Sequence, residues 1–418
     1  MNKRRIGLII LVVAAGLILF KQCKGDVASW YVDNYVRHPT AFPSSERPDL
    51  VCLTWCDDPC TTQAIQWRTA PVVAEGWVQY RAKDSTSEPP AEVQAQRAVL
   101  EDPLVDNDPV NHRFTAVLHG LLPSTAYAYR VGSNQPEAWS EWAEFETAPA
   151  NPEAFSLIYL GDAQVGMDYW GKLLQQAYEH QPEAAFCIIA GDLVNNGSYR
   201  NEWDAFFAAA VGLFDRHPLV PAPGNHDYDG QAEPQLYLDL FGLPENGPQG
   251  ITPEKTYAFH YGNAHFIVLD SNVSAKKQTS WLESQLAGSK AVWKIAVYHH
   301  PAYASKEHRD NQELREQWGA IFDQYHVDLA LQGHDHAYLR TPPMKGGRAV
   351  DSPREGTIYV VSVSGTKYYP QADHDYAAVA MTNTSTYQTI DIALNPDRLT
   401  YRAMDDKGAV RDEVVIEK

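Results

Sequence analysis

Positive charge is what this sequence has least of. It contains 34 Lys and Arg residues against 53 Asp and Glu residues, and its formal net charge is -19. Because nucleic-acid surfaces require clustered Lys and Arg, this composition argues against a nucleic-acid-binding protein. An anionic substrate would instead need metal ions to hold it. Neither disorder nor a fibrous structure is expected, since 44% of the residues are hydrophobic, as in ordinary globular proteins.

Long apolar runs are also scarce, and the conspicuous one lies at the N-terminus. Asn2-Lys3-Arg4-Arg5 precedes the uninterrupted apolar or small residues 6–20, and Lys21 and Lys24 follow. Residues 1–25 are therefore predicted to be a signal segment or a membrane anchor. We favour an uncleaved anchor because no small-x-small cleavage site directly follows the run. At about 1.5 Å per residue the run is shorter than the roughly 30 Å hydrocarbon core, so an anchor would need snorkelling lysines.

A buried core helix is the third alternative for this segment. In the two leading cases the positive cluster stays in the cytoplasm. The rest of the chain is then expected to be extracytoplasmic, either periplasmic or secreted, and to meet the membrane only through the N-terminal segment.

Cysteines are few, and the sequence contains five of them. Cys56 and Cys60 flank a turn at Asp57-Asp58-Pro59, which a small disulfide would close in an oxidising compartment. A metal role for Cys52, Cys56 and Cys60 is the alternative, but no fourth ligand is evident nearby. Cys187 lies within an apolar run and is predicted to be a buried free thiol.

The length of 418 residues predicts two domains. Residues 46–148 contain short alternating strands without a helical period. Within them, residues 121–131 (Leu-Leu-Pro-Ser-Thr-Ala-Tyr-Ala-Tyr-Arg-Val) resemble the tyrosine corner of a fibronectin type III sandwich. Residues 139–142 and 145–147 are expected to form its last strand, and its aromatic residues are interpreted as core packing rather than as a ligand platform.

Residues 153–418 show the alternation of apolar strand, polar motif and helical stretch that is typical of an α/β domain. Strands are predicted at residues 155–160, 184–190, 219–223, 264–269, 294–298, 328–331 and 357–363. Helices are predicted at residues 169–180, 202–214, 279–287 and 312–325.

Five short polar motifs follow predicted strands in this second domain. They are Gly161-Asp162-Ala163-Gln164, Gly191-Asp192, Gly224-Asn225-His226-Asp227, His299-His300 and Gly333-His334-Asp335-His336. Since strand-helix-strand units return such loops to one edge of a sheet, the motifs are expected to converge. Carboxylates, amide oxygens and imidazoles on rigid strand ends suit divalent cations. One shared carboxylate, for which Asp192 is the candidate, would bring two ions about 3.5–4 Å apart. Each motif alone also occurs in ordinary turns and cores, so the prediction depends on all five occurring in this order.

This order resembles that of the calcineurin-like metallophosphoesterases, whose pattern runs Asp-x-His, Gly-Asp, Gly-Asn-His-Asp/Glu, His and Gly-His-x-His. The sequence is most similar to the purple acid phosphatase branch, which also carries a fibronectin type III-like domain in front. The resemblance covers roughly residues 46–418. It implies that residues 153–418 form a metallophosphoesterase domain, a mixed β-sandwich flanked by helices, with C-terminal strands.

The resemblance also implies a ligand set for two metal ions. The first ion would take Asp162, Asp192 and His336, and the second would take Asp192, Asn225, His299 and His334. His299 is preferred to His300 because it stands two residues before a proline, as in the family's histidine-x-proline pattern. His226 would be the catalytic acid that protonates the leaving oxygen. Asn195, His300 and His308 are candidates for supporting roles around the ligands, although His308 also fits a solvated histidine.

Two departures from the family pattern matter. Purple acid phosphatases place a tyrosine three residues after the bridging aspartate, where this chain has Asn195. The protein is therefore predicted to be colourless and to need no ferric ion. Gln164 stands where other members have histidine, and its amide oxygen can ligate Mn²⁺ or Mg²⁺, though more weakly than imidazole ligates Zn²⁺ or Fe²⁺. The metals are predicted to be two divalent ions of Mn, Zn, Fe or Mg, with the first site the more labile.

The function implied is that of a phosphohydrolase that cleaves small phosphorylated molecules with water or hydroxide activated by two metals. Phosphomonoester hydrolysis is favoured over phosphodiester or pyrophosphate hydrolysis. An alternative of a different class is a binding or adhesion protein whose metal site has decayed. Loops at residues 229–255 and 303–311 would set the specificity, and the sequence leaves the oligomeric state open.

Overall fold

The computed structural model of the chain describes residues 37–85, 89–133 and 138–418. The predicted signal segment or anchor at residues 1–25 lies outside the described residues. Within the described ranges, every helix is too short or too polar to span a lipid bilayer.

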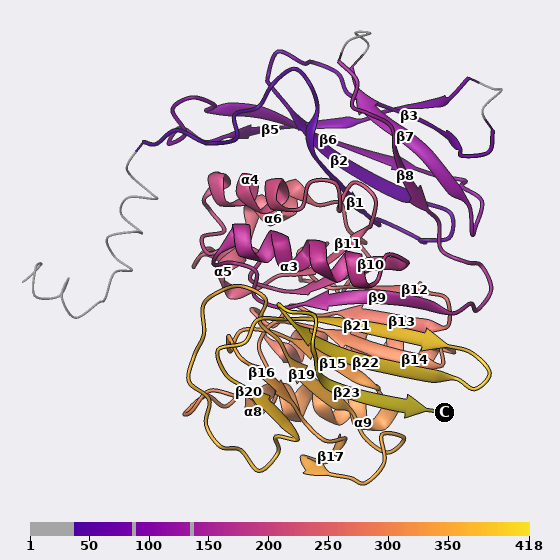
Figure 1. Cartoon of the computed structure of the whole chain (residues 1–418), viewed down its shortest axis with the longest axis vertical. Coiled ribbons are helices and arrows are strands. Elements are labelled where there is room, and N and C mark those ends of the chain that lie inside the picture. The colour runs from indigo at the N-terminus through magenta and orange to yellow at the C-terminus, as the bar shows by residue number, and fades with distance from the viewer. Residues whose placement is uncertain (1–36, 86–88, 134–137) are drawn as a thin grey trace, which may run out of the picture.

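An antiparallel β-sandwich forms the first part of the chain and lies at one end of the molecule (Figure 1). One sheet has the order β1 (Asp49–Thr54), β2 (Gln63–Thr69), β6 (Val110–Leu118), β5 (Gln96–Glu101). The other has the order β4 (Ala91–Gln94), β3 (Trp77–Ala82), β7 (Ala126–Gly132), β8 (Ala143–Glu146). Trp67 and Phe114 stack in its core at 5.5 Å between ring centroids. The hydroxyl of Tyr127 accepts a hydrogen bond from the backbone N–H of Leu122 at 2.9 Å, which confirms the predicted tyrosine corner.

The prediction for the last strand of this sandwich was partly wrong. The strand covers only Ala143–Glu146. Trp139 and Trp142 are half-buried instead, and the guanidinium carbon of Arg130 lies 4.9 Å from the ring centroid of each. Trp139 still pairs with the end of β7 through an isolated antiparallel bridge to Gly132, so this segment adjoins the sheet without forming a regular strand.

Two further sheets face each other in the second part of the chain. The six-stranded sheet has the order β11 (Leu219–Ala222), β10 (Ala184–Ala190), β9 (Phe155–Leu160), β21 (Thr386–Ala393), β22 (Arg398–Asp405), β23 (Val410–Glu417). The seven-stranded sheet has the order β12 (Tyr257–Tyr261), β13 (Ala264–Val268), β14 (Trp293–Val297), β15 (Leu329–Gln332), β19 (Ile358–Val361), β16 (Tyr338–Arg340), β20 (Val379–Met381). A small hairpin joins β17 (Met344–Lys345) to β18 (Arg348–Ala349). Both large sheets mix parallel and antiparallel pairs, which confirms the predicted mixed sandwich.

Helices flank these sheets, and the single-turn helix α5 lies at the edge where the polar motifs meet. They are α3 (Met167–His180), α4 (Arg200–Ala209), α5 (Asn225–Tyr228), α6 (Gln235–Leu240), η1 (Ala275–Gln278), α7 (Thr279–Gly288), α8 (Gln312–Leu314), the π-helical turn η2 (Arg315–Gly319) and α9 (Ala320–Tyr325). Figure 1 shows α3, α4 and α6 between the β1–β8 sandwich and the sheet that contains β9. The helix predicted at residues 202–214 ends at Ala209, because Gly212 has a left-handed φ of 82°. The helix predicted at residues 312–325 is divided by the π-helical turn.

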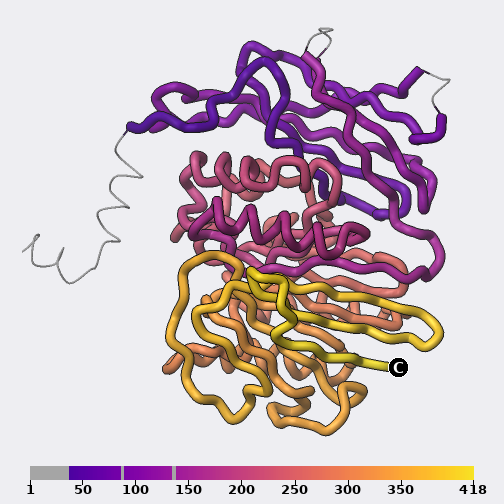
Figure 2. Tube along the Cα trace, viewed as in Figure 1, coloured from indigo at the N-terminus to yellow at the C-terminus, as the bar shows by residue number. Residues whose placement is uncertain are grey.

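Buried ion pairs join α4 to the sandwich. Arg68 of β2 lies 2.9 Å from Asp204 of α4, and Arg200 of α4 lies 3.2 Å from Asp108. All four side chains are nearly inaccessible to solvent. The chain passes from the sandwich into the second domain along one side of the molecule, after β8 (Figure 2).

The predicted disulfide is absent, since Cys56 and Cys60 are free thiols in the structure. The Cys60 thiol donates to the carbonyl of Pro149 at 3.4 Å. The turn between the cysteines is closed by hydrogen bonds instead, from the N–H groups of Thr61 and Thr62 to the Asp58 carbonyl. Cys187 is buried and free, as predicted.

Candidate metal centre

The carboxyl ends of neighbouring parallel strands bring the five polar motifs together. Strand β9 is parallel to β10, and β10 to β11, so the motifs that follow them leave the sheet at one edge. In the facing sheet β14 is parallel to β15, which places His299 beside the Gly333–His336 segment. The hydroxyl of Tyr159 on β9 donates to the Gln332 carbonyl on β15, and this bond ties the two edges together.

Four of the predicted ligands have left-handed backbone conformations. The φ angles are 44° at Asp162, 53° at Asp192, 76° at His334 and 48° at His336. Residues other than glycine rarely adopt such angles, and they occur chiefly where the surrounding structure imposes them, often at functional sites. The backbone is thus bent at the positions from which these side chains project.

Two motif glycines allow the loops to approach closely. A Cβ on Gly224 would lie 2.1 Å from the backbone nitrogen of Asp192 and 2.2 Å from its Oδ1. A Cβ on Gly333 would lie 2.6 Å from Oδ2 of Asp162. Only glycine fits at these two contacts, because real Cβ atoms do not approach other heavy atoms so closely.

Two groups of potential ligands share one carboxylate. Asp192, His299 and His334 form one group, and Asp162, Asp192 and His336 form the other; in each, the ligand atoms lie within 4.8 Å of one another. Asn225 joins the first group, since its Oδ1 lies 3.2 Å from Nε2 of His299. Asp192 belongs to both groups, which is the position required of a bridging ligand.

Buried polar atoms around the shared carboxylate are of the kinds that bind cations. Oδ1 of Asp162 and both amide atoms of Gln164 have no hydrogen-bond partner, and Oδ2 of Asp192 lies 3.2 Å from Nε2 of His299. The three side chains are at most 5% exposed, and the Gln164 backbone N–H donates to the Asp192 carbonyl at 3.1 Å. Since buried polar groups are normally paired, these oxygens have the surroundings of metal ligands.

The pKa shifts of the buried acidic and imidazole groups also indicate a site for cations. Burial raises the pKa of Asp162 well above its usual value, and the Asp192 carboxylate adds to this effect. Burial alone would raise the pKa of Asp192, but the His299 imidazole outweighs it and lowers that pKa to about 2. Burial would lower the pKa of His299, yet Asp192 and then Asp162 raise it to about 9. Two buried carboxylates thus require positive charge between them, which metal ions also supply.

Backbone carbonyls fix the orientation of three histidines. Nδ1 of His299 lies 2.9 Å from the Ala190 carbonyl, and Nδ1 of His336 lies 3.0 Å from the Lys367 carbonyl. Because a carbonyl only accepts, each Nδ1 carries the hydrogen and Nε2 is left for a metal. Nδ1 of His226 is held in the same way by the Asn195 carbonyl at 2.6 Å.

The sequence did not identify Asp227 as a residue that organises the site. Its carboxylate accepts hydrogen bonds from the N–H groups of Asp192, Leu193, Val194 and Gly224 at 2.7 to 3.3 Å. It therefore joins the loop that follows β10 to the loop that follows β11. The Gly-Asn-His-Asp motif already contained this aspartate. Its hydrogen-bond partners could be identified only in the folded structure, where β10 and β11 are adjacent.

The supporting candidates are placed differently from one another. Nδ1 of His300 lies 2.8 Å from the Ser271 hydroxyl, and its ring centroid lies 4.2 Å from that of His334. His308 is directed to solvent, with a side chain that is 89% exposed and lies 3.4 Å from Glu307. The structure thus brings His300, but not His308, against a predicted ligand.

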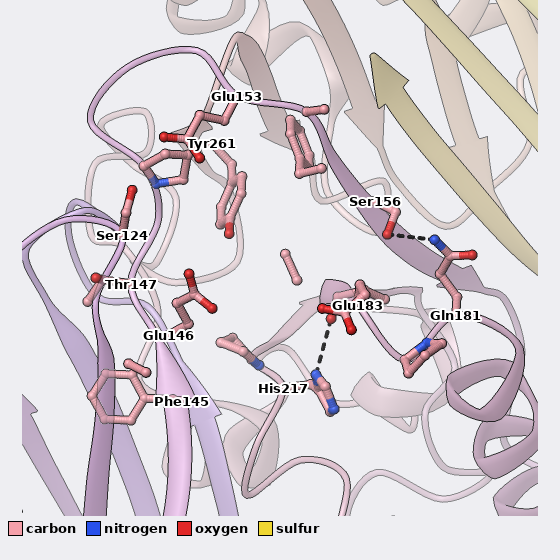
Figure 3. A pocket seen from close by; sticks show the side chains of 18 of the residues that line it. Ser124, Phe145, Glu146, Thr147, Glu153, Ser156, Gln181, Glu183, His217 and Tyr261 are labelled. Atoms are coloured by element: carbon pink, nitrogen blue, oxygen red, sulfur yellow. Dashed lines mark hydrogen bonds between the residues drawn. The ribbon is translucent and has the colours of Figure 1, made fainter. Parts of the chain in front are cut away.

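A groove lies elsewhere, at the junction of the two domains. This groove of about 800 Å³ is lined at the start of β9 by Phe155 and Ser156 and at the start of β10 by Ala184 and Ala185. Figure 3 shows acidic side chains around it, namely Glu146, Glu153 and Glu183. The metal-binding motifs follow the opposite ends of these strands. The groove is therefore separate from the candidate metal centre.

Comparisons with known proteins give matches to both parts of the chain. The family model for calcineurin-like phosphoesterases matches residues 155–338, and that for the N-terminal domain of purple acid phosphatases matches residues 48–147. Purple acid phosphatase 23 of Arabidopsis thaliana is 27% identical over 262 residues, which are 54% of this chain and 56% of that protein. Fe(3+)-Zn(2+) purple acid phosphatase 12 of the same plant is 26% identical over 370 residues, 81% of this chain and 76% of that protein. The chain spans about half the length of the first curated relatives it matches.

A solved structure shares the whole architecture. Purple acid phosphatase PPD1 from yellow lupin (Lupinus luteus) seeds superimposes with a TM-score of 0.75 at 19% identity, covering 89% of this chain and 74% of that chain. The fold is thus an N-terminal β-sandwich followed by an α/β metallophosphoesterase domain. With the two ligand groups around Asp192, the family matches imply a dinuclear metal centre.

Proposed function

Because the chain joins a purple acid phosphatase N-terminal domain to a calcineurin-like phosphoesterase domain, we propose that it is a metal-dependent phosphohydrolase that prefers phosphomonoesters. The main support for the proposal is that Asp192 belongs to both ligand groups. A carboxylate so placed holds two cations close enough to act on one phosphate.

The residues would divide between two ions. Asp162, Asp192 and His336 would hold the first, and Asp192, Asn225, His299 and His334 the second. Gln164 would complete the first site through its unpaired amide oxygen. An amide oxygen in place of an imidazole favours Mn²⁺ or Mg²⁺ there, whereas the two imidazoles of the second site also suit Zn²⁺ or Fe²⁺.

The bound metals would supply Lewis acidity toward the phosphoryl oxygens and a lower pKa for the attacking water. His226 would provide the proton that the leaving oxygen requires. Its Nδ1–H is fixed on the Asn195 carbonyl, so the imidazolium presents Nε2–H as the proton donor. After transfer the ring is neutral and keeps its bond to Asn195. Asp227 would keep this acid in place, because it joins the loop before His226 to Asp192.

An extracytoplasmic location is part of the proposal and rests on the sequence of residues 1–25.

Small phosphorylated molecules are the proposed substrates, and phosphodiesters or pyrophosphates are the alternative within the same chemistry. A binding protein with a decayed site is disfavoured, because carboxylates and imidazoles still gather in two groups around Asp192 and Asn225 lies beside one of them.

The test compares turnover of an aryl phosphomonoester and an aryl phosphodiester by protein that has been stripped of metal and reloaded with Mn²⁺, Zn²⁺, Mg²⁺ or Fe²⁺. Asp192→Asn removes the shared carboxylate, and Asp405→Asn, at the end of β22, is the matched control. Metal-dependent turnover that Asp192→Asn abolishes and Asp405→Asn retains is expected. Absence of turnover with every metal would favour the binding protein.

A further inference from the structure

Two lysines lie beside one aromatic ring at the edge of the candidate metal centre. Nζ of Lys306 lies 4.2 Å from the ring centroid of Tyr369, and Nζ of Lys367 lies 5.4 Å from it. The Tyr369 ring in turn lies 4.7 Å from the ring of His336, centroid to centroid. The Tyr369 ring is therefore a neighbour of both ammonium groups and of His336, which is a predicted metal ligand.

These ammonium groups have no acidic partner in the described structure. In residues 37–85, 89–133 and 138–418 the lysines that form ion pairs are Lys83, Lys255 and Lys418. Lys306 and Lys367 are half-buried, and they share one ring in a protein of net charge -19. An anion bound beside this ring would meet two positive charges that no carboxylate of the described residues neutralises. Stacking on tyrosine stabilises a cation only modestly and does not neutralise it.

Hydrogen bonds tie both lysine backbones to the ligand loop. The N–H of Lys306 donates to Asp335 at 3.2 Å, between the ligand histidines, and the carbonyl of Lys367 accepts from His336 Nδ1 at 3.0 Å. The N–H of Tyr369 donates to the His336 carbonyl at 3.2 Å. The loops at residues 303–311 and 365–369 are thus fixed to the loop that carries His334 and His336. Their lysine side chains therefore lie beside the loop that carries two predicted metal ligands, His334 and His336.

We propose that Lys306 and Lys367 form an anion subsite, which selects phosphoesters whose leaving group carries a second anionic group. The proposal rests on the proposed phosphohydrolase function and specifies its substrate class. The metals would hold the phosphate that is cleaved, and the two ammonium groups would bind a carboxylate or a second phosphate on the leaving group.

Three matched substrates test this subsite: phenyl phosphate, 3-carboxyphenyl phosphate and benzene-1,3-bisphosphate. The full chain, loaded with metal, is compared with Lys306→Met, Lys367→Met and the double variant. The quantity measured is the ratio of kcat/KM for each doubly anionic substrate to kcat/KM for phenyl phosphate. The control is Lys277→Met, because Lys277 is exposed on η1 and the change in net charge is the same.

Wild-type and control protein are expected to favour the doubly anionic substrates. Each single variant should lower the ratio by about tenfold through KM, since one charged contact amounts to roughly 1.4 kcal/mol. A fall confined to 3-carboxyphenyl phosphate identifies a carboxylate as the second anion, and a fall confined to the bisphosphate identifies a phosphate. Unchanged ratios, or equal losses for all three substrates, would overturn the proposal.

A binding measurement separates this proposal from the proposed function. Pyrophosphate and orthophosphate are titrated calorimetrically into each metal-loaded protein. The double variant should lose affinity for pyrophosphate by at least about tenfold relative to its affinity for orthophosphate. If the wild type hydrolyses none of the esters, the phosphohydrolase function fails, but this titration still decides whether the anion subsite exists. Equal affinity changes for both anions would contradict the subsite.

Discussion

Asp335 offers a sharp test of how the ligand loop is supported. It lies between His334 and His336, is fully buried, and accepts hydrogen bonds from the backbone N–H groups of Ser305 and Lys306. It also pairs with Arg309, whose side chain is 23% exposed. In Asp335→Asn the amide has one acceptor oxygen, so either the backbone donors or the guanidinium loses its partner. Since a hydrogen bond to a charged group stabilises by about 1.5–3 kcal/mol, we expect the free energy of unfolding to fall by about 3 kcal/mol.

Metal affinity is expected to fall as well, although Asp335 belongs to neither ligand group. Residues that orient metal ligands typically change affinity by about 10- to 100-fold when they are substituted. Urea unfolding of the metal-free protein, followed by tryptophan fluorescence, gives the stability, and calorimetric titration with Mn²⁺ gives the affinity.

Asp405→Asn is the matched control for this variant. Asp405, at the end of β22, accepts hydrogen bonds from the N–H groups of Lys407 and Ala409 and pairs with Arg411 at 3.0 Å. It should lose stability but keep its metal affinity. The reasoning is refuted if Asp335→Asn binds Mn²⁺ as tightly as the wild type and Asp405→Asn do.

Three other predictions concern packing, pH and colour. Gly224→Ala would bring a Cβ to 2.1 Å from the Asp192 nitrogen, so we expect a loss of about 2 kcal/mol or more in urea unfolding together with weaker Mn²⁺ binding; wild-type values would contradict the close contact. Burial raises the pKa of Glu254 to about 7 from 4.5, so its stabilising contribution is complete below pH 4.5 and is lost as the pH rises through 7. Between pH 4.5 and 8 the free energy of unfolding of the wild type should therefore fall by up to about 3 kcal/mol more than that of Glu254→Gln. Parallel pH curves for the two proteins would show that Glu254 is not responsible. Because Asn195 replaces a tyrosine, protein loaded with Fe³⁺ should show no tyrosinate charge-transfer band in its visible spectrum, and a purple colour would prove this expectation wrong.

The sequence predicted most of the fold because the relevant signals are local. The strands at residues 155–160 and 184–190 were predicted with the bounds that the structure shows, since each is a continuous apolar run. The tyrosine corner was also predictable, because Tyr127 bonds to a group only a few residues away. The end of α4 at Ala209 was missed, since an apolar pattern continues beyond it and Gly212 is a weak signal for termination.

What the sequence did not predict depends on contacts between distant segments. The role of Asp227 requires β10 and β11 to be neighbours, and the exposure of His308 depends on how its loop packs. The left-handed angles at Asp162 and His334 also depend on the assembled site, although Asp and His adopt such angles more readily than most residues. The spacing of Cys56 and Cys60 suggested a disulfide, but spacing alone does not decide pairing, and both are free thiols in the structure.

The position of β9 between β10 and β21 sets an order of events during protein synthesis. Every predicted ligand has been synthesised once His336 is made, but the antiparallel neighbour of β9 comes from Thr386–Ala393, near the other end of the chain. Pairings between segments so far apart in sequence form late. A growing chain therefore displays all its metal-binding groups before the sheet that aligns Asp162 can close. We therefore expect the candidate metal centre to bind its ions tightly only after β21 has paired with β9.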